Sequence, residues 1–317
     1  MSVLVEGKNL KKYFPTSSGM LRAVDDVSFI INSGETLGVV GESGCGKSTL
    51  GRVTNHLLPL TSGQLLFDGK DVTELGKKAL GSVRKEMQMI FQDPFSSLNP
   101  RMTISQTIAE PLIIQGERDK QKLGQEVDRI MELVGLDQRL RNTYPHELDG
   151  GRRQRIGIAR ALILQPRFIV CDEPVSALDV SIQAQILNLM MDLQDEMKLS
   201  YMFITHDLSV VRHISNNIMV MYMGKVVETG STEELFTNPC HPYTLALLSA
   251  VLPVDIHHKR SNISIQGEVT SPIDPPAGCR FAPRCKYATK ACLEATPPLK
   301  EITPNHTVAC HNVQNKL

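Results

Sequence analysis

Apolar runs of two kinds alternate along the chain. The short stretches "TLGVVG" (36–41), "RFIVCDEP" (167–174) and "YMFITHD" (201–207) predict strands, whereas residues 181–197 place apolar side chains at helical spacing. Strands that alternate with helices are typical of an α/β fold built on a parallel sheet. The pattern therefore predicts a parallel-sheet core.

Three regions depart from this alternation. The first thirty-odd residues and "GQLLFDGKDV" (63–72) predict an antiparallel β section, and residues from about 75 to 160 predict an inserted helical subdomain. Beyond about residue 235 proline becomes dense, and four of the seven cysteines fall between 279 and 310. We therefore expect one large domain over residues 1–250 and a small proline- and cysteine-rich module over residues 251–317.

Composition narrows the classes of partner. Lys plus Arg equals Asp plus Glu at 34 each, there is no tryptophan and aromatic residues make up 5%, so nothing favours nucleic acid as a partner. The N-terminus lacks the pattern of a signal peptide, and no stretch approaches the roughly 18 apolar residues that span a bilayer. We expect a cytosolic protein that reaches any membrane through integral partners.

The stretch "GESGCGKST" (41–49) fits the pattern G-x-x-x-x-G-K-[ST], directly after a predicted strand and before a predicted helix. The glycines let backbone N–H groups curl around a β-phosphate, Lys47 reaches the β and γ oxygens, and the Ser48 hydroxyl can bind Mg²⁺. A glycine turn that merely starts a helix is the alternative. The predicted nucleotide-binding residues of this loop are Gly41, Glu42, Ser43, Gly44, Cys45, Gly46, Lys47, Ser48 and Thr49.

Acidic residues follow the predicted strand "FIVCDEP". Asp172 ends the strand and is suited to hold Mg²⁺, while Glu173 is the candidate general base that orients the attacking water. A solvated acid pair after a strand is the alternative. Asp179, in "SALD", precedes a helix and has the alternative role of an N-cap.

Two more polar residues follow apolar runs. Gln92 comes after "MQMIF" and His206 after "MFIT". Parallel sheets place ligand sites at the carboxyl ends of their strands, so both residues are candidates for the same catalytic site.

Taken together and in this order, these motifs resemble the ATPase subunit of ABC transporters over roughly residues 3–250. The resemblance implies a P-loop NTPase cassette that works as a head-to-tail dimer with two ATP molecules at the interface. It implies that Tyr13 stacks on adenine, that Gln92 senses the γ-phosphate and binds Mg²⁺, and that His206 contacts the γ-phosphate. Gly150, Gly151 and Asp179 would contact the ATP that a partner subunit holds.

A narrower resemblance rests on "FQDPFSSLNPR" (91–101), "HPYTLALLSA" (241–250) and the cysteine-bearing tail. These segments are similar to the oligopeptide/dipeptide permease group, in particular its second ATPase subunit. The resemblance implies a heterodimer of ATPase subunits beneath two integral membrane permease subunits, at the cytoplasmic face, with an extracytoplasmic binding protein that delivers peptide.

Alternative functions follow from nearby classes. Importers of nickel or another small solute belong to the same group. A soluble, non-transport ABC ATPase would usually carry two cassettes or long inserted coiled coils, and the chain has neither. An iron–sulfur redox protein that uses ATP would rest on the tail alone.

The helix-start signature is unusual. In "HELDGGRRQR" Asp149 stands where the ABC family usually has serine, and Arg152 where it usually has glutamine. An ionised Asp149 cannot donate a hydrogen bond to a γ-phosphate and repels it, which predicts one degenerate ATP site in an asymmetric heterodimer. The alternative is that Asp149 caps its helix, because aspartate is a favoured N-cap.

Four tail cysteines, Cys279, Cys285, Cys292 and Cys310, are separated by 5, 6 and 17 residues. They could hold a [4Fe–4S] cluster or zinc, or remain unliganded; a cytosolic compartment argues against disulfides, and close C-x₂-C pairs typical of zinc ribbons are missing from this set. The resemblance to peptide permease ATPases implies the [4Fe–4S] cluster. We expect Cys45 and Cys171 to be packing residues.

Overall fold

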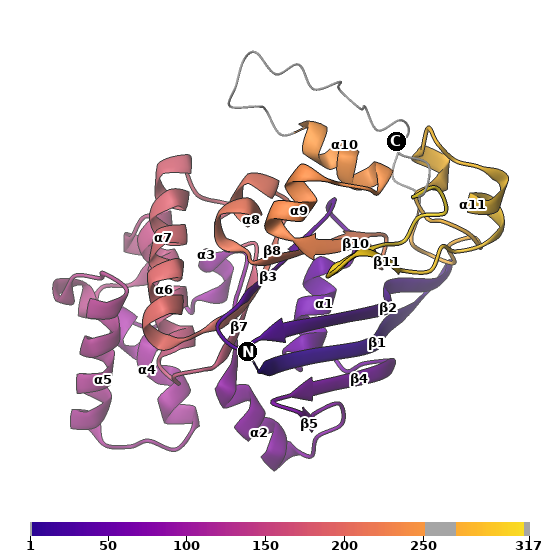
Figure 1. Cartoon of the computed structure of the whole chain (residues 1–317). Helices are drawn as coiled ribbons and strands as arrows, with labels where there is room; N and C mark the ends of the chain where they lie inside the picture. The colour runs from indigo at the N-terminus through magenta and orange to yellow at the C-terminus, as the bar shows by residue number, and fades with distance from the viewer. Residues whose placement is uncertain (1, 251–270, 314–317) are drawn as a thin grey trace. The chain divides into compact units, whose positions relative to one another are not determined.

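The computed structural model describes residues 2–250 and 271–313, and its polypeptide divides into two compact units. The helical unit contains residues 1–2, 32–35 and 74–202, and the phosphate-loop unit contains residues 3–31, 36–73 and 203–317. Figure 1 locates the elements of each unit along the chain.

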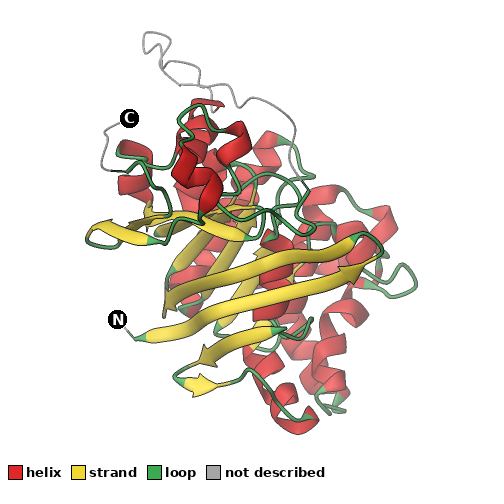
Figure 2. Ribbon diagram, turned by 90° about the vertical axis from the view of Figure 1, so that its right-hand side faces the viewer, coloured by secondary structure: helices red, strands yellow, loops and turns green. Residues whose placement is uncertain are grey.

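One sheet of the phosphate-loop unit is antiparallel. Its strands are β1 (Val3–Thr16), β2 (Gly19–Asn32), β4 (Ser62–Phe67) and β5 (Lys70–Asp71), in the order β2-β1-β4-β5. β1 and β4 pair in antiparallel register, with Val5 opposite Phe67. Figure 2 shows the long strand that begins near the N-terminus, β1, beside its neighbours in this sheet. The antiparallel section that the sequence predicts is confirmed.

A second group of strands in this unit has the order β11-β12-β10-β9-β3. β3 (Thr36–Val40) pairs in parallel with β9 (Asn217–Tyr222), and β10 (Lys225–Ser231), β12 (His306–Val308) and β11 (Lys300–Thr303) continue antiparallel. All five residues of β3 are buried, as expected of a strand covered on both faces. The core beside it holds Val40, Val220, Tyr222, Tyr243 and Phe281.

The helices of the phosphate-loop unit are short. They are α1 (Lys47–Thr54), α8 (Leu208–Ile214), α9 (Thr232–Thr237), α10 (Pro242–Ala250) and α11 (Lys290–Glu294), with a 3₁₀ turn, η3 (Ala282–Arg284), in the tail. Within the part of the chain that the structure describes, no helix combines the length and the apolarity needed to cross a bilayer.

The helical unit contains most of the longer helices. In chain order it holds α2 (Lys77–Glu86), β6 (Met87–Ile90), α3 (Pro94–Ser97), α4 (Ile104–Ile114), α5 (Lys120–Leu133), η1 (Gln138–Asn142), η2 (Pro145–Glu147), α6 (Gly150–Leu162), β7 (Phe168–Asp172) and α7 (Val180–Met197). β6 and β7 are parallel, with Met87 opposite Phe168. β8 (Ser200–Thr205) begins in this unit and ends in the other.

The predicted strands at 36–41, 167–174 and 201–207 are confirmed as β3, β7 and β8, and the predicted helix at 181–197 as α7. The sequence predicts a separate small module in the tail. Its described residues 271–313 group with the phosphate-loop unit, because β12 hydrogen-bonds to the edge of β10 and Leu21 bridges to Ile273. Residues 251–270, where we placed the start of the module, lie outside the described residues.

Candidate functional site

The loop at 41–49 connects β3 to α1 and is built around glycines. Gly41, Gly44 and Gly46 all have positive φ angles. At Gly46, with φ of 105°, an added Cβ would lie 2.0 Å from the carbonyl oxygen of Ala23, so no other residue fits there without movement of the backbone. The loop then enters α1 at Lys47, and backbone N–H groups at such a helix start attract anions.

Lys47 is buried within this loop. Its Nζ donates to the carbonyl oxygens of Gly41, at 2.6 Å, and Glu42, at 2.9 Å. Ser43 and Gly44 are exposed, while Ser48 and Thr49 are half-buried. Burial raises the pKa of the neighbouring Cys45 thiol, which fits a packing role for its side chain. The lysine ammonium therefore already faces the curve of the loop in which phosphates would lie.

Tyr13, the predicted adenine platform, is half-buried on β1. Its hydroxyl donates to the carboxylate of Asp25, and the guanidinium of Arg22 lies 5.7 Å from the centre of its ring. Burial and the hydrogen bond to Asp25 raise the pKa of Tyr13 to about 12, so the hydroxyl stays protonated. The Tyr13 ring thus already has a cation–π neighbour in Arg22. Stacking of Tyr13 on adenine stays a prediction.

In the helical unit, β7 delivers the two predicted acids. Asp172 is buried at the last position of the strand, and Glu173 follows it with the left-handed φ of 48°. Such a conformation is rare for a residue with a side chain and is typical of functional turns. The structure brings Glu173 together with Gln92, whose Nε2 donates to Glu173 Oε2 at 3.0 Å. Residues that are 81 positions apart thus meet as the shared catalytic role predicts.

The signature region begins α6. Asp149 is the N-cap: its Oδ1 accepts a hydrogen bond from the backbone N–H of Arg152 at 2.8 Å, and its Oδ2 lies 3.2 Å from Arg152 Nη1. An added Cβ at Gly151 would lie 2.8 Å from Ile182 of α7, which explains the need for glycine. Asp179 precedes α7 as its N-cap residue without a side-chain capping bond. The capping alternative for Asp149 matches this geometry, and the capping alternative for Asp179 does not.

His206, the remaining predicted catalytic residue, follows β8 directly and is exposed. It lies in the phosphate-loop unit with Tyr13 and the loop at 41–49. Gln92, Asp172, Glu173 and the signature residues all lie in the helical unit.

Two residues that sequence reasoning missed hold the start of the phosphate loop. Arg284 forms a two-pronged ion pair with the Glu42 carboxylate, at 2.7 Å and 3.1 Å, and the Tyr243 hydroxyl accepts the backbone N–H of Glu42 at 2.8 Å. A signal was present in "CRFAPRC" (279–285), where an arginine follows the first cysteine and another precedes the second. Its partner could not be read, because 242 residues separate Arg284 from Glu42.

The four tail cysteines lie near one another. The backbone N–H of Cys279 donates to the carbonyl oxygen of Cys292 at 2.7 Å, and the thiols of Cys285 and Cys310 are electrostatic neighbours of Cys292. Burial raises the pKa of the Cys279 thiol to about 11 and also raises the pKa values of Cys285 and Cys310. All are free thiols in the structure.

A buried ionic group lies beside the tail. His306 Nε2 is 2.8 Å from Glu228 Oε1, and Glu228 also accepts the backbone N–H groups of Cys240 and His241. The candidate ligand atoms of Glu228, Cys240 and His306 lie within 4.8 Å of one another. The hydrogen bond to Glu228 outweighs burial and raises the pKa of His306, which favours an ion pair at this position.

Comparison with known proteins decides the family. The model of the ABC transporter family matches residues 24–176, and that of the oligopeptide/dipeptide transporter C-terminal region matches residues 227–292. An oligopeptide transport ATP-binding protein of Bacillus subtilis (strain 168), AppF, is 52% identical over 319 residues, which cover 97% of each chain. The chain belongs to the ATP-binding subunits of the ABC oligopeptide/dipeptide transporter family.

Two further likenesses agree with this family. The dipeptide transport ATP-binding protein DppF of Haemophilus influenzae is 48% identical over 316 residues, covering 98% of this chain and 97% of the relative. A dimeric ATP-binding cassette, MJ0796, solved with ADP and Pi, superimposes with a TM-score of 0.66 at 28% identity over 72% of this chain and 99% of that one. As a member of the family the chain is an ATPase, and ATP and Mg²⁺ are expected for ATPases of this family.

Proposed function

We propose that this subunit hydrolyses ATP to energise the import of di- or oligopeptides. The observation that carries the proposal is similarity along the whole chain: relatives named for oligopeptide and dipeptide transport match its cassette and its tail together. In this proposal the subunit lies at the cytoplasmic face of a membrane, bound to two integral permease subunits. A peptide-binding protein delivers cargo from the other side.

We assign the chemical step to the residues that the sequence predicts for it. The loop at 41–49 binds the phosphates, Lys47 stabilises the β and γ oxygens, and Glu173 orients and deprotonates the attacking water. The hydrogen bond from Gln92 supports this role for Glu173, because it fixes one carboxylate oxygen at the predicted γ-phosphate sensor. His206 stabilises the transferred phosphoryl group.

Ser48, Asp172 and Gln92 would hold Mg²⁺. A hydroxyl, a carboxylate and an amide oxygen are the hard oxygen ligands that this ion prefers. The position of Asp172 at the carboxyl end of β7 fits such a ligand, since parallel sheets place their ligand sites at these ends. When bound, the ion neutralises charge that develops on the phosphates.

We further propose that the subunit pairs with a second, non-identical ATPase subunit and that Asp149 weakens the ATP site which the partner's phosphate loop contributes. In its capping position the Asp149 carboxylate places negative charge at the start of α6, where it would repel a γ-phosphate. The capping bond itself fits the alternative equally well, so the charge carries the proposal. The dimeric structure of the MJ0796 cassette is a precedent for dimer formation alone.

Asp149→Ser tests the asymmetry in the assembled transporter, because serine still caps a helix but carries no charge. We expect ATP occupancy of the partner's site to rise about tenfold, measured by counting bound nucleotide at limiting ATP. Asp149→Asn is the control for charge alone. Unchanged occupancy in both variants would remove Asp149 from any role in ATP binding.

For the tail we propose a small cysteine-bearing module that holds a [4Fe–4S] cluster on Cys279, Cys285, Cys292 and Cys310. The backbone N–H of Cys279 donates to the carbonyl oxygen of Cys292, and the thiols of Cys285 and Cys310 are electrostatic neighbours of Cys292, so the four candidate ligands share one part of the tail. The cluster would have a structural role, because it would cross-link the tail.

Glu173→Gln is the decisive test of the catalytic assignment. We expect ATP turnover of the assembled transporter to fall by at least about 100-fold while ATP binding is kept, because only the base is lost. Retained turnover would take Glu173 out of that role. Peptide uptake in cells that lack the gene tests the cargo, and loss of nickel uptake with intact peptide uptake would contradict peptide import.

A further inference from the structure

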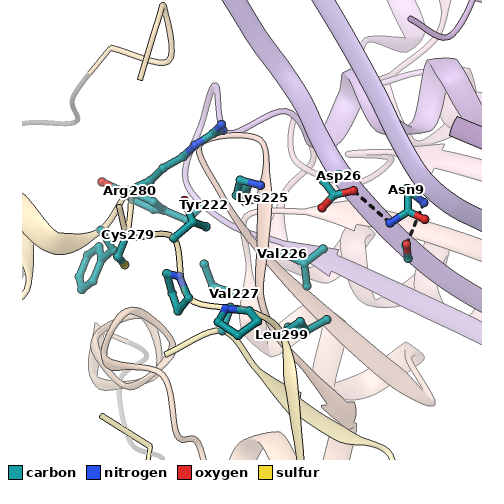
Figure 3. A pocket seen from close by; sticks show the side chains of 15 residues that line it. Asn9, Asp26, Tyr222, Lys225, Val226, Val227, Cys279, Arg280 and Leu299 are labelled. Atoms are coloured by element: carbon teal, nitrogen blue, oxygen red, sulfur yellow. Dashed lines mark hydrogen bonds between the residues drawn. The ribbon is translucent and has the colours of Figure 1, made fainter. Parts of the chain in front are cut away.

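The tail segment Cys279–Cys285 contacts the predicted nucleotide site at two places. Arg284, at one end, binds Glu42, and Arg280, at the other end, donates to Asp25 and to the carbonyl oxygen of Met223. Figure 3 shows Arg280 beside Cys279, with Tyr222 and Lys225 nearby. Both arginine side chains are under one-tenth exposed.

Every polar group of Glu42 has a partner. Its N–H donates to Tyr243, its carbonyl oxygen accepts from Lys47, and its carboxylate binds Arg284 with both oxygens. Arg284 Nη1 also donates a hydrogen bond to the Tyr222 hydroxyl at 3.3 Å, which helps to hold the guanidinium in place. Glu42 therefore links the phosphate-binding lysine to two segments of the chain beyond residue 240.

The charge of Glu42 matters because the loop is meant to receive a triphosphate. An unpaired carboxylate at the second position of the loop would repel the phosphates through a partly desolvated environment, in which charge–charge interactions are strong. The bidentate pairing both neutralises this carboxylate and directs it toward the tail.

The other end of the segment supports the same arrangement. Asp25 binds Arg280 and also accepts the hydroxyl of Tyr13, the residue predicted to stack on adenine. Lys225 Nζ lies 3.7 Å from Asp25. One short stretch of the tail thus contacts the residues that border both the phosphate and the base positions.

We propose that Arg284 is a positioning residue for ATP: it neutralises Glu42 and fixes the entry of the phosphate loop, so the tail forms part of the nucleotide site. The inference rests on the proposed placement of the triphosphate at residues 41–49. It assigns no chemical step to Arg284, which acts through Glu42.

The test is nucleotide affinity of the full-length chain with Arg284→Met, a variant that keeps an apolar stem and removes the charged guanidinium. We expect the dissociation constant for ATP to rise about tenfold, that for ADP less, and that for adenosine least, because the effect acts through charge. The loss should shrink at high salt. Turnover should show a raised KM with kcat nearly unchanged.

Two more variants keep the test decisive if Arg284→Met lowers stability. Glu42→Gln combined with Arg284→Met removes both charges and should restore ATP affinity to within about twofold of the parent protein. Arg284→Lys keeps the charge without the fork and should lose only about threefold. Lys290→Met, an exposed tail lysine 3.7 Å from Glu294, is the matched control and should change nothing.

The outcomes separate this inference from the proposed site. If Lys47→Ala leaves ATP binding intact, the placement of the triphosphate is wrong. If Lys47→Ala abolishes binding while Arg284→Met binds ATP like the parent protein, the placement stands and the role of Arg284 is wrong. Equal weakening of ATP, ADP and adenosine, without rescue by Glu42→Gln, would also overturn it by showing a general structural effect.

Discussion

Two helix starts in this protein use the same backbone chemistry in opposite ways. α1 begins after Gly46, which has no side chain to accept hydrogen bonds from the first turn, whereas α6 begins after Asp149, whose carboxylate accepts the N–H of Arg152. The first start therefore leaves its N–H groups for an external anion, and the second supplies its own. From this comparison we expect the residue before a helix to change how strongly the positive end of that helix attracts a phosphate.

The largest expected effect comes from breaking the open start. Gly46→Ala forces a Cβ to within 2.0 Å of the Ala23 carbonyl oxygen in a left-handed conformation. We expect ATPase activity to fall by at least about 100-fold and the unfolding free energy to fall by about 2–4 kcal/mol, measured by turnover and chemical denaturation. Gly44→Ala is the control, because its φ of 77° gives strain but nothing lies within 4 Å of the added Cβ. Equal losses in both variants would mean that strain, and not the close contact, limits the loop.

Next in size is the close packing beside the capped start. Gly151→Ala places a Cβ 2.8 Å from Ile182, so we expect a loss of about 1–3 kcal/mol in the unfolding free energy. Gly157→Ala in the same helix has nothing within 4 Å of its new Cβ, and should stabilise the protein by about 0.5–1 kcal/mol. Thermal melting of the two variants checks the contrast. A stabilised Gly151→Ala protein would show that α7 moves away easily.

Removing the cap is the third test. Asp149→Ala deletes the acceptor for Arg152 N–H and should lower the unfolding free energy by about 1 kcal/mol, or the melting temperature by about 2–4 °C. Asp149→Ser should recover most of this loss, since serine is also a favoured N-cap. An unchanged melting temperature in the alanine variant would mean that the cap contributes nothing to stability.

The smallest effect belongs to the side chain of Arg152. Its guanidinium pairs with Asp149 at 3.2 Å, and both side chains are more than half exposed. Water and salt screen such a pair, so Arg152→Met should change the unfolding free energy by less than about 0.5 kcal/mol. A loss above about 1.5 kcal/mol would show that this arginine holds Asp149 in its capping position.

Sequence reasoning succeeded where the determinants are local. The glycine-rich turn between β3 and α1 follows from nine consecutive residues, and strands β3, β7 and β8 follow from short apolar runs. The phosphate-binding role of that turn stays a prediction. The sequence offers the cap at Asp149 as one of two alternatives. This contact is predictable because aspartate accepts a hydrogen bond from a backbone N–H only three residues away.

Contacts between distant residues could not be read in the same way. The sequence predicts that Gln92 and Glu173 belong to one site, but it does not predict the hydrogen bond between them. It gives no indication of the ion pair between Arg284 and Glu42. The sequence also does not predict the position of the tail, because nothing in the residues of β10 indicates that β12 pairs with its edge. The residue types along a strand edge specify only weakly which other strand will pair with it.

The edge of β10 pairs with β12, a strand that is synthesised much later, and this order has a consequence for synthesis of the protein. Thr229 on β10 contacts Thr307 on β12, a separation of 78 residues. At about 5–20 residues per second a ribosome needs roughly 4–16 seconds to make the intervening stretch. During that interval the edge of β10 in the nascent chain has no partner strand, and an unpaired strand edge is a template for aggregation. We expect a chaperone to act on the nascent chain at this edge.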